Sequence, residues 1–302
     1  MVAADQGTVA PVGGRGVRPT AMTTSAVARR GDLSVTAYYT AHAWRWAKLP
    51  GAELFTGRKS RDVFNATNLA LGVARLFRRD LPSLRHGLVQ RHVMIDRLVA
   101  GTGCHQVIEL AAGLSRRGVT MSEDPALRYV EVDLPAMIAH KQKLLARTAR
   151  GRAIAARPNL VLHAADVTTL AIDDVLAPGP ACIVAEGLLV YLDAAAQQAL
   201  WRKLAAVCAA RPGSAVVFDL VPFVEQPRPG RVGRAFERMF RRATRGATMA
   251  FDGRTRDDIA AELRAAGFTA VEQHEPASAP AAWAVPHLAR RTQQLVWRAA
   301  VA

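Results

Sequence analysis

The chain has 302 residues, half of them hydrophobic, which suits one large α/β domain or one domain with a sizeable cap. Its formal net charge is +15, but the arginines that supply most of it are spread along the chain without a long basic run, so we expect no nucleic-acid partner. No apolar run reaches the ~18 residues of a membrane span, which argues against a membrane partner.

The start of the chain lacks the pattern of a secretory signal, and the three cysteines have no metal-like spacing. We therefore expect a cytoplasmic protein in a reducing compartment, with no metal. Scattered Gly, Pro and Thr predict a disordered tail over residues 1–25. Residues 26–103 predict an N-terminal helical cap, with amphipathic helix from about 36 to 84, broken near Pro50 and Pro82, and a further helix over 88–101.

The pattern changes from residue 104 to the end at 302, where short apolar, β-branched runs alternate with helical stretches. The runs that predict strands are 106–112, 128–135, 159–167, the start of 181–192, 213–222, 268–275 and 293–301. The stretches that predict helices are 136–149, 193–210 (with Asp193 as N-cap) and 255–268. This alternation predicts an α/β fold with a doubly wound, mostly parallel, seven-stranded Rossmann-like sheet of the methyltransferase type.

Residues 224–256 interrupt the alternation after the fifth strand. They are rich in Arg, Gly and Pro, and they include one short helical pattern around 235–242. We interpret them as an insertion that forms a lid over the carboxyl edge of the sheet.

Acidic residues stand at four successive strand ends: Glu109, Asp133, Asp166 and Glu186. Ligands of open α/β sheets bind beyond the carboxyl ends of the strands, where the strand order reverses. Each acid alone could cap the following helix. The four together predict a ligand site.

The turn after the first strand reads Ala111-Ala112-Gly113-Leu114-Ser115-Arg116 and contains a single glycine. A dinucleotide site would need G-x-G-x-x-G so that backbone can approach a pyrophosphate, and the Walker pattern is also absent. A ligand with adenosine but no pyrophosphate fits better. Asp133 lies 20 residues after Gly113, where an acid can accept hydrogen bonds from ribose hydroxyls. This pattern predicts S-adenosylmethionine as the cofactor, with S-adenosylhomocysteine as the product.

The motifs "IELAAGLSRR", "YVEVDLP", "AADV" and "AEGLLVYL" occur in the order in which the leucine carboxyl methyltransferase family has them. The chain resembles that family, which includes bacterial relatives that methylate polyketides and other small molecules. The resemblance runs from about Tyr38 to Phe223. Against the usual first motif, E-L-G-A-G-x-D-T-R, Ala111 replaces the first glycine and Ser115 replaces the aspartate.

The resemblance implies a set of cofactor-binding residues: Arg91, Glu109, Ala111, Gly113, Asp133, Leu134, Asp166, Val167, Glu186 and Gly187. Within this set, Arg91 would pair with the methionine carboxylate and Glu186 with the methionine amino group, while Gly113 would line the methionine part. Asp133 would hold the ribose, and Asp166 with Val167 would contact adenine. Tyr39 and Tyr191 are candidates for the acceptor pocket.

The expected activity is O-methyl transfer to a carboxylate or hydroxyl of a small molecule, in polyketide or other secondary metabolism. A carboxylate acceptor needs no base, whereas a phenol or alcohol usually does. No histidine stands in a recognisable base motif, so no catalytic residue is assigned. Three alternatives stay open: a protein C-terminal carboxyl methyltransferase, an RNA methyltransferase that uses the arginines of 224–245, and a non-catalytic cofactor-binding relative. The sequence does not predict the oligomeric state.

Overall fold

A computed structural model of the chain describes residues 35–78, 81–226 and 253–301. The tail expected over 1–25 and most of the lid insertion expected over 224–256 lie outside the described residues.

Within these residues seven strands form one sheet, in the order β3-β2-β1-β4-β5-β7-β6. The strands are β1 (Gln106–Leu110), β2 (Arg128–Asp133), β3 (Leu160–Ala164), β4 (Cys182–Ala185), β5 (Ala215–Asp219), β6 (Ala270–His274) and β7 (Val296–Ala300). The pairs among β1 to β5 are parallel, and β7 runs antiparallel between β5 and β6. The predicted α/β, mostly parallel, seven-stranded sheet is therefore confirmed.

The strand order reverses direction at β1. The chain moves outward from β1 through β2 to β3, and then returns to β4 on the other side of β1. The loops that leave β1 and β4 consequently diverge at the point where such sheets bind ligands.

The sheet separates two apolar cores, because neighbouring residues of a strand point to opposite faces. On β1, Val107 packs into a core shared with α4 (Leu84–Gly101) and α5 (Arg117–Met121). The next residue, Ile108, packs into a core shared with α8 (Ala194–Ala210) and α10 (Arg256–Ala265). Because Glu109 follows the same alternation, its side chain lies on the face covered by α4 and α5.

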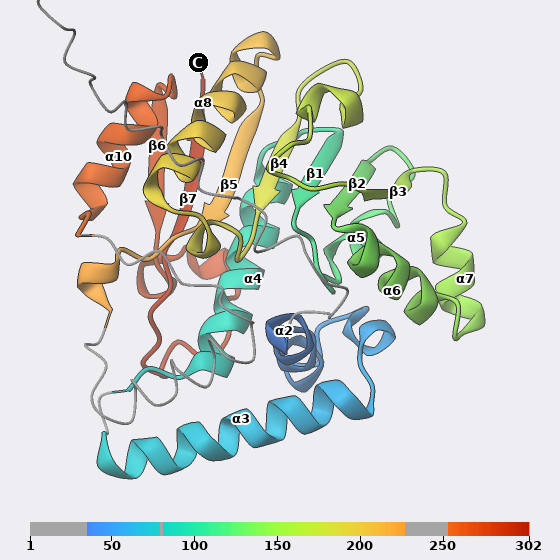
Figure 1. Ribbon diagram of the computed structural model, residues 1–302, viewed down its shortest axis with the longest axis vertical. Helices are drawn as coiled ribbons and strands as arrows, with labels where there is room; N and C mark the ends of the chain where they lie inside the picture. The colour runs from blue at the N-terminus through green and yellow to red at the C-terminus, as the bar shows by residue number, and fades with distance from the viewer. Residues whose placement is uncertain (1–34, 79–80, 227–252, 302) are drawn as a thin grey trace, which may run out of the picture.

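The N-terminal elements lie at the carboxyl ends of the parallel strands, toward which the arrows of β4 and β5 point in Figure 1. They are α2 (Val35–Trp46), the short 3-10 helix η1 (Ala52–Phe55) and α3 (Arg58–Phe77). The helix break predicted near Pro50 is present, because α2 ends at Trp46 and η1 begins at Ala52. Gly51, with a φ of 82°, is the residue immediately before η1. Although the sequence prediction placed α4 in the cap, α4 packs against the sheet. The domain boundary at residue 103 stays a prediction.

The helix predicted over 136–149 is wrong as a single element. The structure has α6 (Pro135–Leu145) and then α7 (Ala149–Ala155). Thr148 caps α7 by accepting a hydrogen bond of 2.9 Å from the Gly151 backbone N–H. The chain turns so tightly here that a Cβ at Gly151 would collide with the Leu145 carbonyl.

The predicted N-cap of α8 is confirmed, because the Asp193 side chain accepts a hydrogen bond of 2.8 Å from Ala196 N–H. Five more 3-10 helices complete the described chain: η2 (Ile172–Val175), η3 (Leu189–Tyr191), η4 (Phe223–Glu225), η5 (Pro276–Ser278) and η6 (Ala281–Trp283).

Candidate functional site

The turn after β1 is held by the acid at the end of β2. The Asp133 carboxylate accepts hydrogen bonds from the backbone N–H of Gly113 (2.6 Å, to Oδ2) and of Leu134 (2.7 Å, to Oδ1). Both oxygens retain a further acceptor position, since a carboxylate accepts about four hydrogen bonds. Burial raises the pKa of Asp133, and the two backbone donors partly offset this effect.

The same turn requires the left-handed backbone conformation at two positions. Ala111 and Gly113 both have φ of 53°. Glycine adopts this conformation without steric cost, whereas alanine does not. A Cβ at Gly113 would have only the Ala37 Cβ of α2 (3.9 Å) and the Ala111 carbonyl (4.0 Å) nearby, so α2 lies close to the turn.

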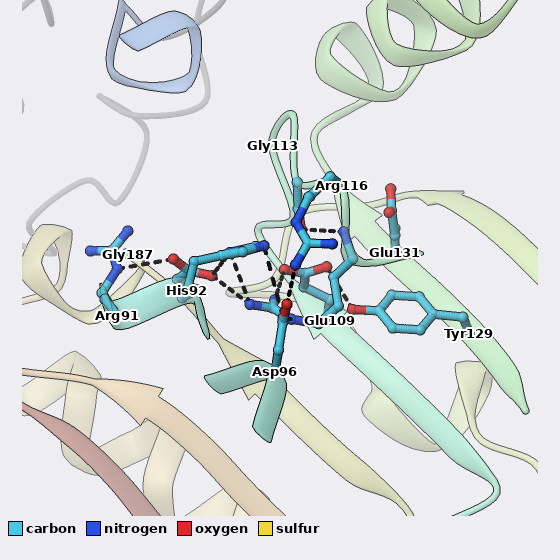
Figure 2. A network of polar contacts seen from close by, with 12 residues as sticks. Arg91, His92, Asp96, Glu109, Gly113, Arg116, Tyr129, Glu131 and Gly187 are labelled. Atoms are coloured by element: carbon cyan, nitrogen blue, oxygen red, sulfur yellow. Dashed lines mark hydrogen bonds and ion pairs between the residues drawn. The ribbon is translucent and has the colours of Figure 1, made fainter. Parts of the chain in front are cut away.

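Arg117, at the start of α5, joins acids from three separate elements. Two of these acids, Asp96 and Glu109, are labelled in Figure 2. The fully buried guanidinium of Arg117 donates to Asp96 of α4 (Nε to Oδ1, 2.6 Å), to Glu186 after β4 (Nη2 to Oε2, 2.7 Å) and to Glu109 of β1. The second oxygen of Glu109 accepts from the Tyr129 hydroxyl at 2.8 Å. Glu109 therefore supports the site from within the core, and its direct contact with a cofactor stays a prediction.

Arg91 lies between two acids on the other side of Glu186. Its Nε donates to Glu186 Oε1 at 3.0 Å, and its Nη1 donates to Asp219 Oδ2 at 2.8 Å. The other oxygen of Asp219 accepts from the Gly187 N–H at 2.6 Å, where φ is 68°. None of the hydrogen bonds among the described residues uses Arg91 Nη2.

These side chains form one cluster of four carboxylates and three guanidinium groups, called here the carboxylate–guanidinium cluster: Asp96, Glu109, Glu186 and Asp219 with Arg91, Arg116 and Arg117. Burial acts to raise the pKa of Glu186, but the hydrogen bond from His92 and the charges of Arg91 and Arg117 more than reverse this, so that its pKa lies well below the usual range. With His92 neutral, the cluster carries one more negative than positive charge.

Asp166 forms a local turn beside this site. Its Oδ1 accepts from the Thr168 backbone N–H (2.9 Å) and hydroxyl (2.7 Å), as expected for a capping aspartate. Ala165 N–H donates to the Asp133 carbonyl at 2.9 Å, which brings Asp166 and the buried Val167 next to the end of β2. The predicted contacts with adenine remain predictions.

The two tyrosines predicted for an acceptor pocket have different surroundings. Tyr39 is buried between α2 and α3, where it stacks on Phe64 with ring centroids 5.3 Å apart and donates to Asn68 at 3.3 Å. These contacts explain Tyr39 as a packing residue between the two helices. The Tyr191 hydroxyl donates to Thr36 Oγ1 at 3.3 Å and so links η3 to α2. The acceptor-pocket role of both tyrosines stays a prediction.

Five residues of the site were not predicted from the sequence: His92, Asp96, Arg116, Arg117 and Asp219. Asp219 could have been found, because it ends the fifth strand just as the four predicted acids end theirs. Arg117 stands inside a quoted motif, but arginine is rarely buried completely and nothing in its neighbours along the chain indicates burial.

Among residues 35–78, 81–226 and 253–301, no cluster of three or more His, Cys, Asp or Glu side chains could hold a metal ion. In the same ranges, none of the helices combines the length and the apolar character needed to cross a membrane.

Residues 35–205 match the family profile described as Leucine carboxyl methyltransferase, a span that covers more than half of the chain. The chain belongs to the leucine carboxyl methyltransferase family. The matched span includes the turn after β1, the three arginines of the carboxylate–guanidinium cluster and three of its four acids, so the site lies almost wholly within the family region.

Curated relatives of this family member match over part of their length. A protein of Mycolicibacterium paratuberculosis, provisionally named as an S-adenosyl-L-methionine-dependent methyltransferase, is 35% identical over 130 residues, covering 42% of this chain and 47% of that protein. A protein of Parafrankia sp. with the same provisional name is 33% identical over 133 residues, covering 41% of this chain and 40% of that protein. The matched region spans less than half the length of these relatives.

One solved structure shares the fold of this leucine carboxyl methyltransferase family member over most of both chains. It is a provisionally named methyltransferase from Thermobifida fusca, with a TM-score of 0.52 and 17% identity, covering 90% of this chain and 96% of that one. At this identity the likeness supports the methyltransferase-type α/β fold alone.

Proposed function

We propose that this protein binds S-adenosylmethionine at the carboxyl edge of its sheet and transfers the methyl group to an oxygen of a small molecule. The observation that carries the proposal is the hydrogen bond from Gly113 to Asp133, which places an acid beside a turn with one glycine. Such a turn suits an adenosine ligand that lacks a pyrophosphate. The family membership and the provisional names of the relatives support the same cofactor.

The residues present fit this cofactor. Asp133 keeps an acceptor position on each oxygen for the two ribose hydroxyls. Arg91 has its Nη2 available for the methionine carboxylate, and the neighbouring Glu186 and Asp219 offer acceptors for the amino group. The excess negative charge of the carboxylate–guanidinium cluster complements the net positive charge of the cofactor.

When bound, S-adenosylmethionine supplies a methyl group that its sulfonium has already activated. The task of the protein is then to hold the acceptor oxygen in line, and such positioning can contribute about 7–11 kcal/mol in favourable cases. Helix α2 lies close to the Gly113 turn through Ala37 and is linked to η3 through Thr36, so it is near enough to this edge to help position the acceptor. A carboxylate acceptor needs no base, and we assign none.

We further propose that the acceptor is a carboxylate or hydroxyl of a small molecule of secondary metabolism, and that the protein acts in the cytoplasm. The RNA alternative needs a track of arginines over 228–245, and those residues lie outside the described ranges. No described feature favours RNA or a protein C-terminus over a small molecule.

The test is release of S-adenosylhomocysteine in the presence of separate acceptor classes: small carboxylic acids, phenols and alcohols, a peptide with a free C-terminal carboxylate, and total RNA. We expect release to increase with a member of the small-molecule classes. Turnover with the peptide or the RNA alone would overturn the acceptor part of the proposal. Cofactor binding with no turnover on any class would favour a non-catalytic relative.

A further inference from the structure

His92 of α4 lies at the centre of the carboxylate–guanidinium cluster (Figure 2). Its side chain is completely buried, and its ring lies against the Trp44 indole of α2, with centroids 4.2 Å apart. Its Nδ1 is 2.8 Å from Glu186 Oε2, and its Nε2 is 3.8 Å from Asp96 Oδ1. The first distance is that of a hydrogen bond, and the second is too long for one.

These contacts define the tautomer of His92. His92 Nδ1 also lies 3.1 Å from Arg117 Nη2, a donor that could bond only to an unprotonated Nδ1. The Glu186 carboxylate is nearer, is ionised and can only accept, and Arg117 Nη2 already donates to it, so the geometry favours the imidazole proton on Nδ1. Burial lowers the pKa of His92, and Arg117 of α5 adds to this, while Glu186 and Asp96 act in the opposite direction. The imidazole is therefore neutral, and its buried Nε2 has no hydrogen-bond partner within the described residues.

The consequence is an asymmetric carboxylate at Glu186. Its Oε2 receives two donors, His92 Nδ1–H and Arg117 Nη2–H, and is saturated. Among the donors in the described ranges, its Oε1 receives only Arg91 Nε–H, which leaves one acceptor position on that oxygen. Without His92, the carboxylate could rotate and exchange the roles of the two oxygens.

We propose that His92 is a positioning residue of the cofactor site, which directs the free acceptor position of Glu186 Oε1 toward the amino group of the cofactor. This inference rests on the proposed function, because it concerns binding of S-adenosylmethionine at the same site. In this role His92 acts through its hydrogen bond to Glu186.

Two substitutions of His92 distinguish the roles of its two imidazole nitrogens. The amide nitrogen of His92→Asn can take the position of Nδ1, whereas that of His92→Gln takes the position of Nε2. A hydrogen bond to a charged group contributes about 1.5–3 kcal/mol, which corresponds to roughly 10- to 100-fold in affinity. In calorimetric titration with S-adenosylmethionine, we expect His92→Asn to bind within about threefold of the native protein and His92→Gln to bind at least about tenfold more weakly.

The outcomes are distinguishable. Equal affinity of both variants and the native protein would overturn the role of His92, and so would tighter binding by His92→Gln than by His92→Asn. No binding by the folded native protein would instead overturn the proposed function.

A second measurement uses the native protein and therefore does not require His92→Asn or His92→Gln to fold. The 15N chemical shifts of the histidine rings in the native protein report which nitrogen carries the proton. We expect one neutral ring protonated on Nδ1, at a histidine protected from solvent exchange. If every exchange-protected histidine is protonated on Nε2, or on both nitrogens at neutral pH, the inference is wrong.

Discussion

The backbone N–H of Gly113 and the carboxylate of Asp133, 20 positions apart in the chain, are joined by a hydrogen bond of 2.6 Å. The acid at the end of β2 thus shapes the turn at the end of β1 and remains available to a ligand. One residue therefore connects the stability of the turn to the binding of the cofactor.

This double role makes the two simplest substitutions of Asp133 differ. In Asp133→Ala both backbone donors lose their acceptor, and we expect a stability loss of about 1–3 kcal/mol together with at least a tenfold loss of cofactor affinity. Asp133→Asn keeps one acceptor oxygen, so it should retain most of the stability but still lose affinity. Urea unfolding and calorimetric titration check the two parts. Unchanged affinity in Asp133→Ala would refute the ribose assignment.

We predict that alanine at position 111 lowers the free energy of unfolding relative to glycine, because this residue has a φ of 53° and carries a methyl side chain. Ala111→Gly should increase the free energy of unfolding by up to about 1 kcal/mol. The substitution removes the cost of about 1–2 kcal/mol that alanine has in the left-handed conformation. Part of this gain is lost, because glycine gives the unfolded chain more conformational entropy. The neighbouring Ala112→Gly is the matched control, because Ala112 has no positive φ, and it should be destabilising. If both variants lose stability equally, the turn is not strained.

Arg117 is expected to be the most sensitive residue of the cluster. Arg117→Met leaves three carboxylates without their shared partner: the buried side chains of Glu109 and Glu186 and the partly exposed side chain of Asp96. Breaking a buried network typically costs about 3–5 kcal/mol. The exposed pair of Arg61 with Asp62, with side chains 58% and 64% exposed, provides the control. Arg61→Ala should change the free energy of unfolding by less than about 1 kcal/mol. Denaturant unfolding measures the stability of both variants. If Arg117→Met loses as little stability as Arg61→Ala, Arg117 is not the shared partner of the three carboxylates.

Acidification should destabilise the protein through His92. Burial lowers its pKa in the folded state, so below about pH 6.5 the unfolded chain gains a proton that the folded protein does not. Stability then falls by up to about 1.4 kcal/mol per pH unit for this group, until the folded pKa is reached. Burial raises the pKa of Glu131 to about 7, which acts in the opposite direction between about pH 4.5 and 7.

The contribution of His92 is therefore measured as a difference. The free energy of unfolding of His92→Asn minus that of the native protein should be constant above about pH 6.5 and should increase as the pH falls below it. Glu131 is present in both proteins and cancels. A difference that is independent of pH from about 8 to about 5 would show that His92 does not titrate differently on unfolding, and a difference that increases as the pH rises above about 6.5 would show that His92 is charged in the folded state.

The sequence predicted the sheet because each of its strands is an apolar, β-branched run between helical stretches. It predicted Glu109, Asp133 and Glu186 because the end of a parallel strand has a fixed place in this fold. The local sequence pattern did not predict the split between α6 and α7. That split depends on the Thr148 cap and on the close approach of Gly151 to Leu145. No hydrophobic periodicity reports such a turn.

The network around Arg117 could not be predicted in this way. Its three carboxylate partners are 21, 8 and 69 positions away in the chain, and only the folded sheet brings them together. His92 likewise reads as one polar residue on an amphipathic helix, and its burial depends on α2 and on the loop after β4. The acids were predictable from topology, whereas the groups that neutralise them required the structure.

The most direct test of the account is calorimetric titration of the folded, full-length protein with S-adenosylmethionine and with S-adenosylhomocysteine, alongside NAD and ATP. The account predicts one site that binds both adenosyl compounds, with no heat from NAD or ATP at the same concentrations. Binding of NAD or ATP with no binding of either adenosyl compound would contradict it.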